Sequence, residues 1–490
     1  MELQFETYDL RCLRPLTQET FRREQTGEAR LPESLPDAAS VVATWGQVLL
    51  RGKEWRSGGV TVTGGVQAFV LYAAEGSGEL HCVDLWLPVQ MKWEFPDPGR
   101  DGQICAWGCI QAIDARLSSA RKILVRADVS VTARCWVRDT VAVPRPGEMP
   151  PDVQVRTDTY PVMLCREAGE HAFTMEEILP VPEMEKIVRY TITPKVTEHR
   201  VMGDKVVFRG ELKVNMLGLS GGRLTVWEGE VPLSQFAELE QTYEEGAEAW
   251  LQWAVTSMEA EPAEGGCSLK CGLACQYVIC QREMVTIPRD GYSIDRETQL
   301  HTVDMEIPCA LQMCSHNLPV SGNMDWEGME VIDATLSAGQ GVYDREEGCY
   351  AVPVFCQTLS RDGEGRVRGD TCRWEEKLPL SAAEGVRPGL VPLVENFSCM
   401  PMGSGLGIEG EILLGEMTEH IWPISGVSGV TVGEMRKKDP NRPSLILCRC
   451  PGGDLWETAK SCHTTEKAIR EANALPDTCP PGKMLIIPIA

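Results

Sequence analysis

The stretch that decides the fold is KVVFRGELKVNM, residues 205–216, in which apolar and polar residues alternate around a central Gly210. Successive side chains of a β-strand point to opposite faces, so this alternation indicates a strand with one buried and one exposed face. Half-buried strands of this kind are typical of antiparallel sheets. The stretch therefore predicts antiparallel β structure.

The same alternation occurs earlier, in VTVTGGVQAFVLY, residues 60–72, where a glycine in the middle of a long strand indicates a bend or a bulge. Its Gly64 lies 146 residues before Gly210, and Leu-Pro-Val at 87–89 lies 144 residues before Val-Pro-Leu at 231–233. Hairpin loops of unequal length would explain the small difference. A third copy is indicated by WEEKLP at 374–379, which follows WEGEVP at 227–232 by 147 residues. Units this long exceed a solenoid repeat, so we expect tandem β domains.

The third copy is the least regular. Its segment 350–359 alternates poorly and contains Pro353. Proline cannot donate a hydrogen bond to a neighbouring strand, so we expect an edge-like or degenerate strand here. A hairpin is predicted to close the first two copies, at 105–137 and 249–279, and in the third copy this hairpin would include residues 405–414.

Proline-rich stretches mark the predicted boundaries, because such stretches form semi-rigid linkers. They contain Pro144, Pro146, Pro150, Pro151, Pro308 and Pro319. The predicted organisation is a β domain at 34–140, a Pro-rich linker at 141–178, a second β domain at 179–284, a divergent third at 318–434 and a different small domain at 443–490. The predicted fold class is mainly β, with tandem antiparallel β-sheet domains followed by a small βααβ domain.

The last segment, 443–490, follows a different pattern. A short apolar strand at 444–448 precedes a turn, and Asp454 is a good N-cap for a first helix with Glu457 three residues later. A second helix is predicted to start at 464–466 and to stop at Pro476. A final apolar strand follows at 483–488, which gives the order βααβ.

This tail resembles the LysM domain. The resemblance rests on Pro451, Gly452, Leu455, Trp456, Ala459, Thr464, Thr465, Asn473, Leu475, Pro481, Gly482, Leu485, Ile486 and Pro488. Gly453 and Asp454 depart from it, because LysM domains usually carry Asp-Thr there. In LysM domains this loop and the loop at 473–475 hold N-acetylated glycans. The resemblance implies a binding surface at Gly452, Gly453, Asp454, Leu455, Asn473, Leu475, Pro476 and Ile487.

The repeated β units resemble the SPOCS (spore coat assembly) domain of endospore-forming bacteria, well in the first two copies and partly in the third. The resemblance implies a non-enzymatic scaffold in the mother-cell cytoplasm, at the forespore surface. Its expected partner is the morphogenetic ATPase of the coat basement layer, bound largely through the LysM-like domain, with other coat proteins as further candidates. The alternative is a protein that binds peptidoglycan or another N-acetylglucosamine glycan through that domain.

Charge and hydropathy exclude several other classes of partner. The chain has 490 residues, with 71 acidic against 47 basic side chains and a net charge of −24. Nucleic acids and anionic membranes are bound by excess Lys and Arg, so neither is expected as a partner. The first residues, MELQFE, lack the basic and apolar regions of a secretory signal, and we find no apolar stretch of about 18 residues. Neither secretion nor membrane insertion is therefore expected.

The sequence offers little catalytic or cofactor chemistry. Seven His are scattered without a His-Glu-x-x-His pair, and G-x-G-x-x-G at 405–410 precedes a predicted strand rather than the helix that a nucleotide site needs. Cys267, Cys271, Cys275 and Cys280 are spaced to lie along one strand and are interpreted as small buried apolar residues. We predict no enzyme, cofactor or metal, while intermolecular cysteine crosslinks and a hydrolase with an acid pair in a cleft stay as alternatives.

Overall fold

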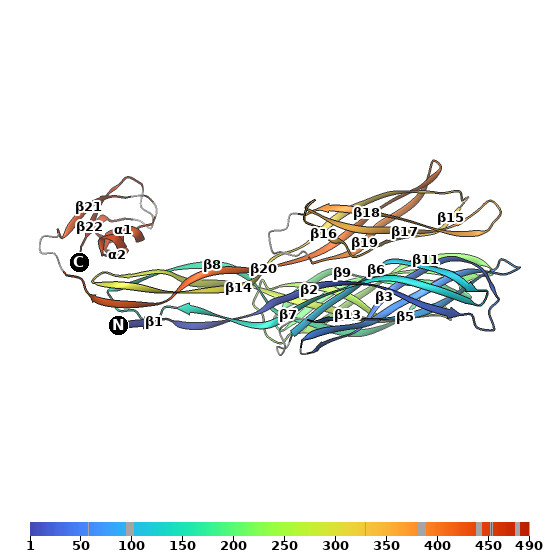
Figure 1. The fold of residues 1–490 in the computed structure, drawn as a ribbon, viewed down its shortest axis with the longest axis horizontal. Helices are drawn as coiled ribbons and strands as arrows, with labels where there is room; N and C mark the ends of the chain where they lie inside the picture. The colour runs from blue at the N-terminus through green and yellow to red at the C-terminus, as the bar shows by residue number, and fades with distance from the viewer. Residues whose placement is uncertain are drawn as a thin grey trace.

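The computed structural model describes residues 1–56, 58–94, 102–328, 330–380, 389–437, 443–450, 452, 454–475 and 481–489. It is mainly β, with antiparallel strands that run along an elongated body (Figure 1). A small C-terminal module lies at the same end of the body as the N-terminus. Among the described residues, no helix is long and apolar enough to cross a membrane.

Unit 1 comprises β2 to β7, whose strands form the sheets β2-β7-β6 and β3-β4-β5. The two sheets share a core that contains Val62, Val70, Val125 and Val129. The short strand β1 (Glu2–Gln4) does not join unit 1 and pairs with β20 instead. The strands of unit 1 are β2 (Glu6–Arg30), β3 (Ala38–Arg56), β4 (Gly59–Ala74), β5 (Leu80–Glu94), β6 (Gly102–Ser119) and β7 (Lys122–Arg145).

Unit 2 repeats this strand order, with the sheets β12-β13-β8 and β11-β10-β9. Its strands are β8 (Val153–Leu179), β9 (Lys186–Met202), β10 (Lys205–Ser220), β11 (Arg223–Glu238), β12 (Glu248–Ala263) and β13 (Gly266–Ser293). The hairpins predicted at 105–137 and 249–279 are confirmed as β6–β7 and β12–β13. The repeat found in the sequence is therefore a repeat of strand topology.

Unit 3 has the same order, although its second strand is broken into β15 and β16. In one sheet, β20 pairs with β14 on one side and with β19 on the other. In the second sheet, β17 pairs with β15 and β16 on one side and with β18 on the other. The strands are β14 (Arg296–Asp325), β15 (Glu330–Ala338), β16 (Val342–Asp344), β17 (Cys349–Arg361), β18 (Val367–Pro379), β19 (Gly389–Met402) and β20 (Gly405–Met435). The G-x-G-x-x-G sequence at 405–410 opens β20 and precedes no helix, as expected.

The predicted linker at 141–178 is wrong, because most of it is strand. Its residues complete β7 and form nearly all of β8, and β2 and β14 likewise begin well before the predicted domains at 34 and 318. The prolines that set the boundaries have different outcomes. Three of them, Pro146, Pro150 and Pro151, lie in the short connection between β7 and β8. Pro144 lies in β7 where only β2 pairs with it, and Pro308 and Pro319 lie in β14, an edge strand of its sheet. A proline on an edge strand can leave the hydrogen bonds of the sheet intact.

Pro353 lies in a strand that was predicted to be edge-like or degenerate. This strand, β17, is not at an edge, because it is paired on both sides. The neighbouring strand is interrupted opposite Pro353, between Ala338 and Val342. The Pro353 carbonyl accepts a hydrogen bond from the Gly339 amide at 2.8 Å. The missing proline N–H therefore faces a gap between strands.

The two central glycines mark bulges, as was predicted for Gly64. The register between β3 and β4 shifts at Gly64, and the register between β9 and β10 shifts at Gly210. A Cβ built on either glycine would lie 2.1 Å from a backbone oxygen, that of Leu49 or of Lys195. Only glycine therefore permits the two backbones to approach this closely.

The cysteines at 267–280 also lie as predicted, along β13. Cys267, Cys271 and Cys275 are buried in one apolar core, while Cys280 is buried in a neighbouring one. Burial raises the pKa of the Cys271 thiol to about 11, so this thiol stays protonated near neutral pH. Within the described structure, these four residues serve as small apolar side chains.

The C-terminal module has the predicted order, β21 (Leu445–Arg449), α1 (Trp456–Cys462), α2 (Glu466–Asn473) and β22 (Met484–Pro488). Its strands pair antiparallel, and both helices contribute to the core beneath them. Thr465 caps α2 through a hydrogen bond from the Ala468 amide at 3.0 Å. The N-cap of α1 is Leu455 rather than the predicted Asp454.

Candidate functional site

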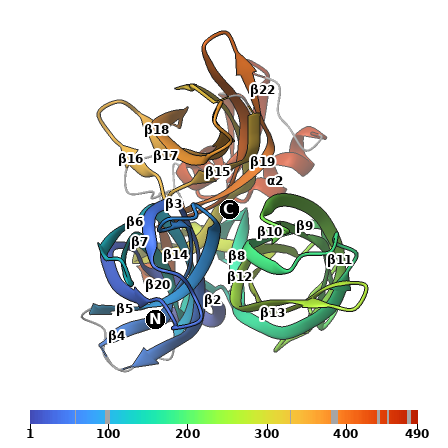
Figure 2. The same cartoon turned by 90° about the vertical axis from the view of Figure 1, so that its right-hand side faces the viewer.

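The three units surround a common centre, as Figure 2 shows for unit 1 in blue, unit 2 in green and unit 3 in orange. A cavity of about 880 Å³ lies between them. Its walls are supplied mainly by corresponding strands of each unit, namely β3 and β6, β9 and β12, and β15 and β19. The cavity is therefore a product of how the units pack and is not contained within one domain.

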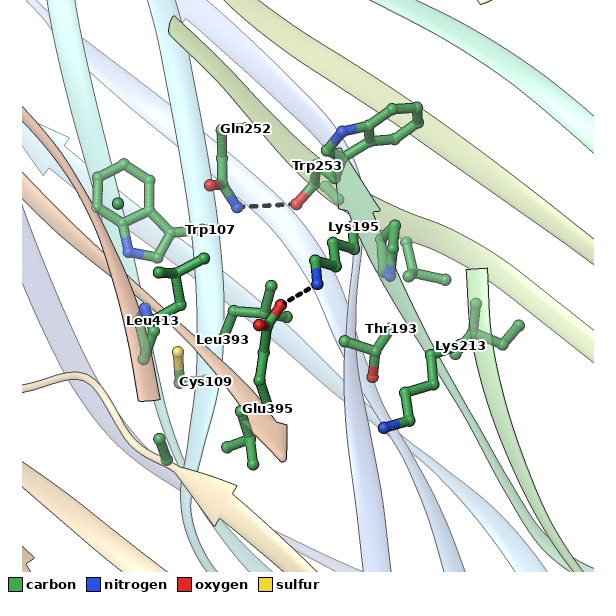
Figure 3. A pocket seen from close by; sticks show the side chains of 18 of the residues that line it. Trp107, Cys109, Thr193, Lys195, Lys213, Gln252, Trp253, Leu393, Glu395 and Leu413 are labelled. Atoms are coloured by element: carbon green, nitrogen blue, oxygen red, sulfur yellow. Dashed lines mark hydrogen bonds and ion pairs between the residues drawn. The ribbon is translucent and has the colours of Figure 1, made fainter. Parts of the chain in front are cut away.

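One ion pair spans the cavity between two units. Lys195 on β9 and Glu395 on β19 form an ion pair at 2.7 Å across the cavity, between unit 2 and unit 3 (Figure 3). The hydrogen bond to Glu395 raises the pKa of Lys195. Trp107 contributes an aromatic wall and packs edge-on to Trp250 at 6.4 Å. These contacts join the units and fix the shape of the cavity.

A buried junction joins all three units beside this cavity. Arg189 on β9 is 1% exposed and pairs with Asp333 on β15, which is 4% exposed, at 2.9 Å. The same guanidinium lies 5.3 Å from the centre of the Trp45 ring on β3. Burial lowers the pKa of Arg189 and raises that of Asp333, because loss of water disfavours both charged forms. The pair therefore stabilises one particular arrangement of the units at an electrostatic cost.

A second junction is centred on Glu419 of β20. Its carboxylate accepts hydrogen bonds from Arg134 at 2.7 Å, from the Trp136 indole at 2.5 Å and from the Cys165 thiol at 3.4 Å. Arg134 and Trp136 lie on β7 of unit 1, and Cys165 lies on β8 of unit 2. Both charges of the Arg134–Glu419 pair are buried, with 5% and 4% of the side chains exposed.

Glutamine side chains add further links between units. The Gln47 amide bonds to both backbone groups of Ile192, at 3.0 and 2.6 Å. Gln276 bonds in the same way to Ala106, at 2.7 and 2.8 Å. Each side-chain amide thus makes the pair of hydrogen bonds that a backbone amide would make in a sheet, and it joins strands of different units. Sequence analysis missed these residues, because alternation shows that a residue is polar without showing what it meets.

The predicted binding residues of the C-terminal module fall into different environments. Leu455 and Ile487 are fully buried in the module core, so the prediction that they form an exposed surface is wrong. Leu475 is half-buried and packs against that core. Gly452 is half-buried with φ of +97°. Gly453 and Pro476 lie outside the described residues.

The two polar residues of this set are engaged within the chain. Asn473 accepts from the Ile486 amide at 2.7 Å and donates to the Ile486 carbonyl at 2.6 Å, so its side chain pairs with the edge of β22. Asp454 accepts from the Trp456 amide at 2.5 Å and pairs with Arg156 on β8 at 2.5 Å. Both side chains therefore have structural roles.

The exposed apolar residues of the module lie on the outward face of the β21–β22 hairpin. We call this set the outer apolar face, and it consists of Leu445 (57% exposed), Leu447 (69%), Met484 (53%) and Ile486 (40%). Leu447 lies directly opposite Ile486 in the hairpin. The sequence could not separate this face from the core, because both faces of the strands are apolar and alternation is lost. Exposed apolar groups of this kind are typical of interaction sites.

The module is fixed to the C-terminal end of β13. The Tyr292 hydroxyl donates to the Thr464 carbonyl at 2.8 Å, and its ring packs edge-on to Trp456 at 5.0 Å. Asp290 accepts from the Trp456 indole at 2.8 Å and from Lys460 at 2.7 Å. These contacts leave the outer apolar face exposed.

Comparison with known proteins finds one match, which lies in unit 2. Residues 183–262 match the family model described as SipL, SPOCS domain. This part of the chain is similar to the SPOCS domain. The matched segment spans β9 to β12, which lie between the long strands β8 and β13 in the chain order of unit 2. No curated protein and no solved structure matches the chain.

The strand order of the SPOCS segment recurs in β3 to β6 of unit 1 and in β15 to β19 of unit 3. The match supports a role in sporulation. It does not extend to the C-terminal module.

Proposed function

We propose that this protein is a non-enzymatic scaffold of the bacterial spore envelope. It works in the mother-cell cytoplasm, where it anchors coat components at the forespore surface by protein–protein contacts. The SPOCS match supports the sporulation context. The observation that carries the scaffold role is the outer apolar face, presented at one end of a body whose units are joined through buried polar junctions.

The C-terminal module, which resembles LysM, docks the morphogenetic ATPase of the coat basement layer. The side chains of the outer apolar face form the centre of the interface, since a few apolar anchors dominate most protein interfaces. Exposed Arg449 and Lys483 flank this face and supply a basic rim. A specific interface needs about 800 Å² on each partner, so neighbouring surface must contribute as well.

Affinity purification from sporulating cells tests this placement. The variant Leu447→Glu/Ile486→Glu puts charge at the centre of the outer apolar face. We expect it to weaken partner binding at least about 30-fold, as expected when more than about 2 kcal/mol is lost. The matched control is Met284→Glu, because Met284 is 64% exposed on β13, away from the face. Full partner recovery by a correctly folded double variant would contradict the proposal.

Glycan binding through the same module is the competing outcome. The engagement of Asp454 and Asn473 within the chain argues against it. Calorimetric titration with N-acetylglucosamine oligomers separates the two functions. The scaffold function predicts millimolar binding or weaker, whereas micromolar binding would favour the glycan function.

A further inference from the structure

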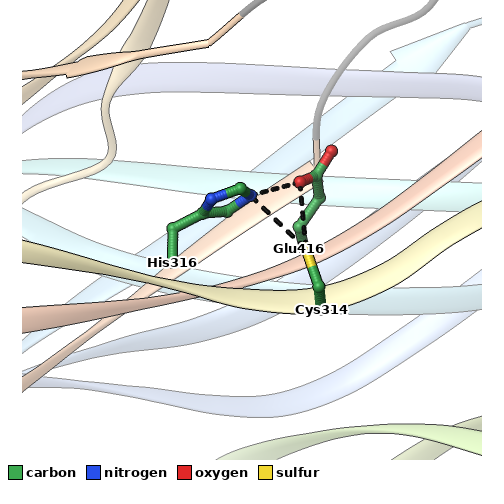
Figure 4. Close-up of side chains that lie close together, drawn as sticks. All are labelled: Cys314, His316 and Glu416. Carbon is green, nitrogen blue, oxygen red and sulfur yellow. Dashed lines mark hydrogen bonds and ion pairs between the residues drawn. The ribbon is translucent and has the colours of Figure 1, made fainter.

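Three side chains with metal-binding chemistry converge where β14 pairs with β20 (Figure 4). Cys314 lies directly opposite Glu416 in the sheet, and His316 is two residues beyond Cys314. Residues two apart on a strand share a face, so all three side chains extend from the same side of the sheet. Their thiol, imidazole and carboxylate atoms lie within 4.8 Å of one another.

The distances approach those of a tetrahedral site. Zinc bonds of about 2.0–2.3 Å place neighbouring ligand atoms about 3.3–3.8 Å apart. The Cys314 sulfur lies 3.5 Å from Nε2 of His316 and 3.5 Å from Oε2 of Glu416. Nε2 and Oε2 are in direct hydrogen-bond contact, so a bound ion would replace that bond and separate these two atoms through side-chain rotation.

The surroundings also suit a metal centre. Glu416 is buried, with 5% of its side chain exposed, and its second carboxylate oxygen accepts a hydrogen bond from the Thr418 hydroxyl. Hydrogen bonds of this kind orient the carboxylate ligands of metal sites. Cys314 and Glu416 line the central cavity. A fourth ligand can therefore reach the site from the cavity.

This set of side chains belongs to unit 3 alone among the three repeats. The first and last strands of each unit pair with one another, and each pair has a bulge at the same place. The register shifts between Pro15 and Thr17 in unit 1, between Cys165 and Glu167 in unit 2, and between Ala310 and Gln312 in unit 3. Counting from the bulges gives the residues that correspond to Cys314, His316 and Glu416 in the other units. In unit 1 they are Glu19, Phe21 and Ala133. In unit 2 they are Gly169, His171 and Tyr277. The juxtaposition is thus not imposed by the repeated fold.

We propose that Cys314, His316 and Glu416 bind one divalent transition-metal ion, with the fourth coordination position open to the central cavity. Zinc is the best fit, because a thiolate, an imidazole and a carboxylate together match its ligand preferences. Three protein ligands with an open position leave room for water or for a donor group from a molecule that enters the cavity.

Metal titration of the full chain tests the site. We expect the protein, reduced and freed of metal, to bind one Zn²⁺ by calorimetry. It should also bind one Co²⁺ with a thiolate-to-cobalt absorption band and a spectrum typical of four-coordinate cobalt. Cys314→Ser should abolish the absorption band, and His316→Gln should weaken Zn²⁺ binding at least about tenfold, as removal of a ligand costs more than the loss of an outer-shell partner.

The matched control is Cys309→Ser, because Cys309 lies on the same strand but outside the cluster. It should retain both the stoichiometry and the cobalt spectrum, which would show that Cys309 is not a ligand and that the loss of the band in Cys314→Ser is not a general effect of replacing a cysteine on β14. The proposal is overturned if the parent chain binds no Zn²⁺, or if Cys314→Ser, shown by circular dichroism to be folded, retains the absorption band. If both ligand variants unfold, the absorption spectrum of the cobalt-loaded parent chain tests the proposal by itself. Bound cobalt without a thiolate-to-cobalt band would contradict the site.

Discussion

At the scale of single residues, buried polar side chains hold the units in register. Arg189 illustrates this, because it meets Asp333 of unit 3 and the Trp45 ring of unit 1 with almost no exposed surface. Both charges lose hydration, so the pair is sensitive to removal of either partner. The alternation of residues in β9 shows neither the burial of Arg189 nor its partner, which is 144 residues away.

Removal of one partner should be costly. We expect Asp333→Ala to lower the free energy of unfolding by about 3–5 kcal/mol, because Arg189 is left charged and buried. Arg189→Leu/Asp333→Leu should recover much of this loss. Urea denaturation measures both, with Glu330→Ala as the control, because the exposed Arg361–Glu330 pair contributes about 0–1 kcal/mol. Equal losses in Asp333→Ala and Glu330→Ala would argue against the junction.

At the scale of elements, glycine bulges and edge prolines shape the strands. We expect Gly210→Ala to destabilise unit 2 by about 1–3 kcal/mol, because the new methyl would clash with the Lys195 carbonyl 2.1 Å away and force the strands apart. Gly415→Ala is the matched control, since a Cβ there meets nothing within 4 Å. Thermal unfolding of both variants checks the prediction, and similar midpoints would refute the tight contact.

Docking of the C-terminal module should depend on pH through Asp290. Burial by itself would raise the pKa of this carboxyl, but hydrogen bonds from Lys460, Trp456 and the Gly291 amide lower it below its usual range. Because the pKa of Asp290 is lower in the folded protein than in the unfolded chain, the ionised carboxylate stabilises the contact between the module and β13 above about pH 4. This stabilisation is lost as the pH falls further.

Hydrogen exchange of α1 measures this effect. After correction for the intrinsic exchange rate at each pH, the amides of α1 should exchange faster as the pH falls below about 4. In Asp290→Asn the module should already be loosened at neutral pH, and its protection should change little in this range. An unchanged pH profile in the variant would show that another group controls docking.

The sequence predicted the elements better than their boundaries and contacts. Period-two alternation located β4 and β10, and the glycine offset of 146 residues matches these two strands along their whole length. The βααβ order of the tail was equally clear. Boundaries failed because proline is tolerated on edge strands, and the outer apolar face was missed because β21 and β22 are apolar on both faces.

At the scale of the whole molecule, the three β units pack into one another and do not form separate domains. The core of unit 2 includes Trp45, Phe69 and Leu71 of unit 1 and Leu359 of unit 3. We therefore expect the three units to unfold in one cooperative calorimetric transition. Three transitions that can be assigned to separate units would contradict this packing.

The central claim is that the chain works by docking a protein through the outer apolar face. Lys483 is exposed and adjoins Met484 of that face, so it is suited to report on the partner. Amine crosslinking in sporulating cells, followed by mass spectrometry, measures the contact directly. We predict crosslinks from Lys483 to a coat protein that disappear in the Leu447→Glu/Ile486→Glu variant. Crosslinks that persist unchanged in the folded variant would contradict the account.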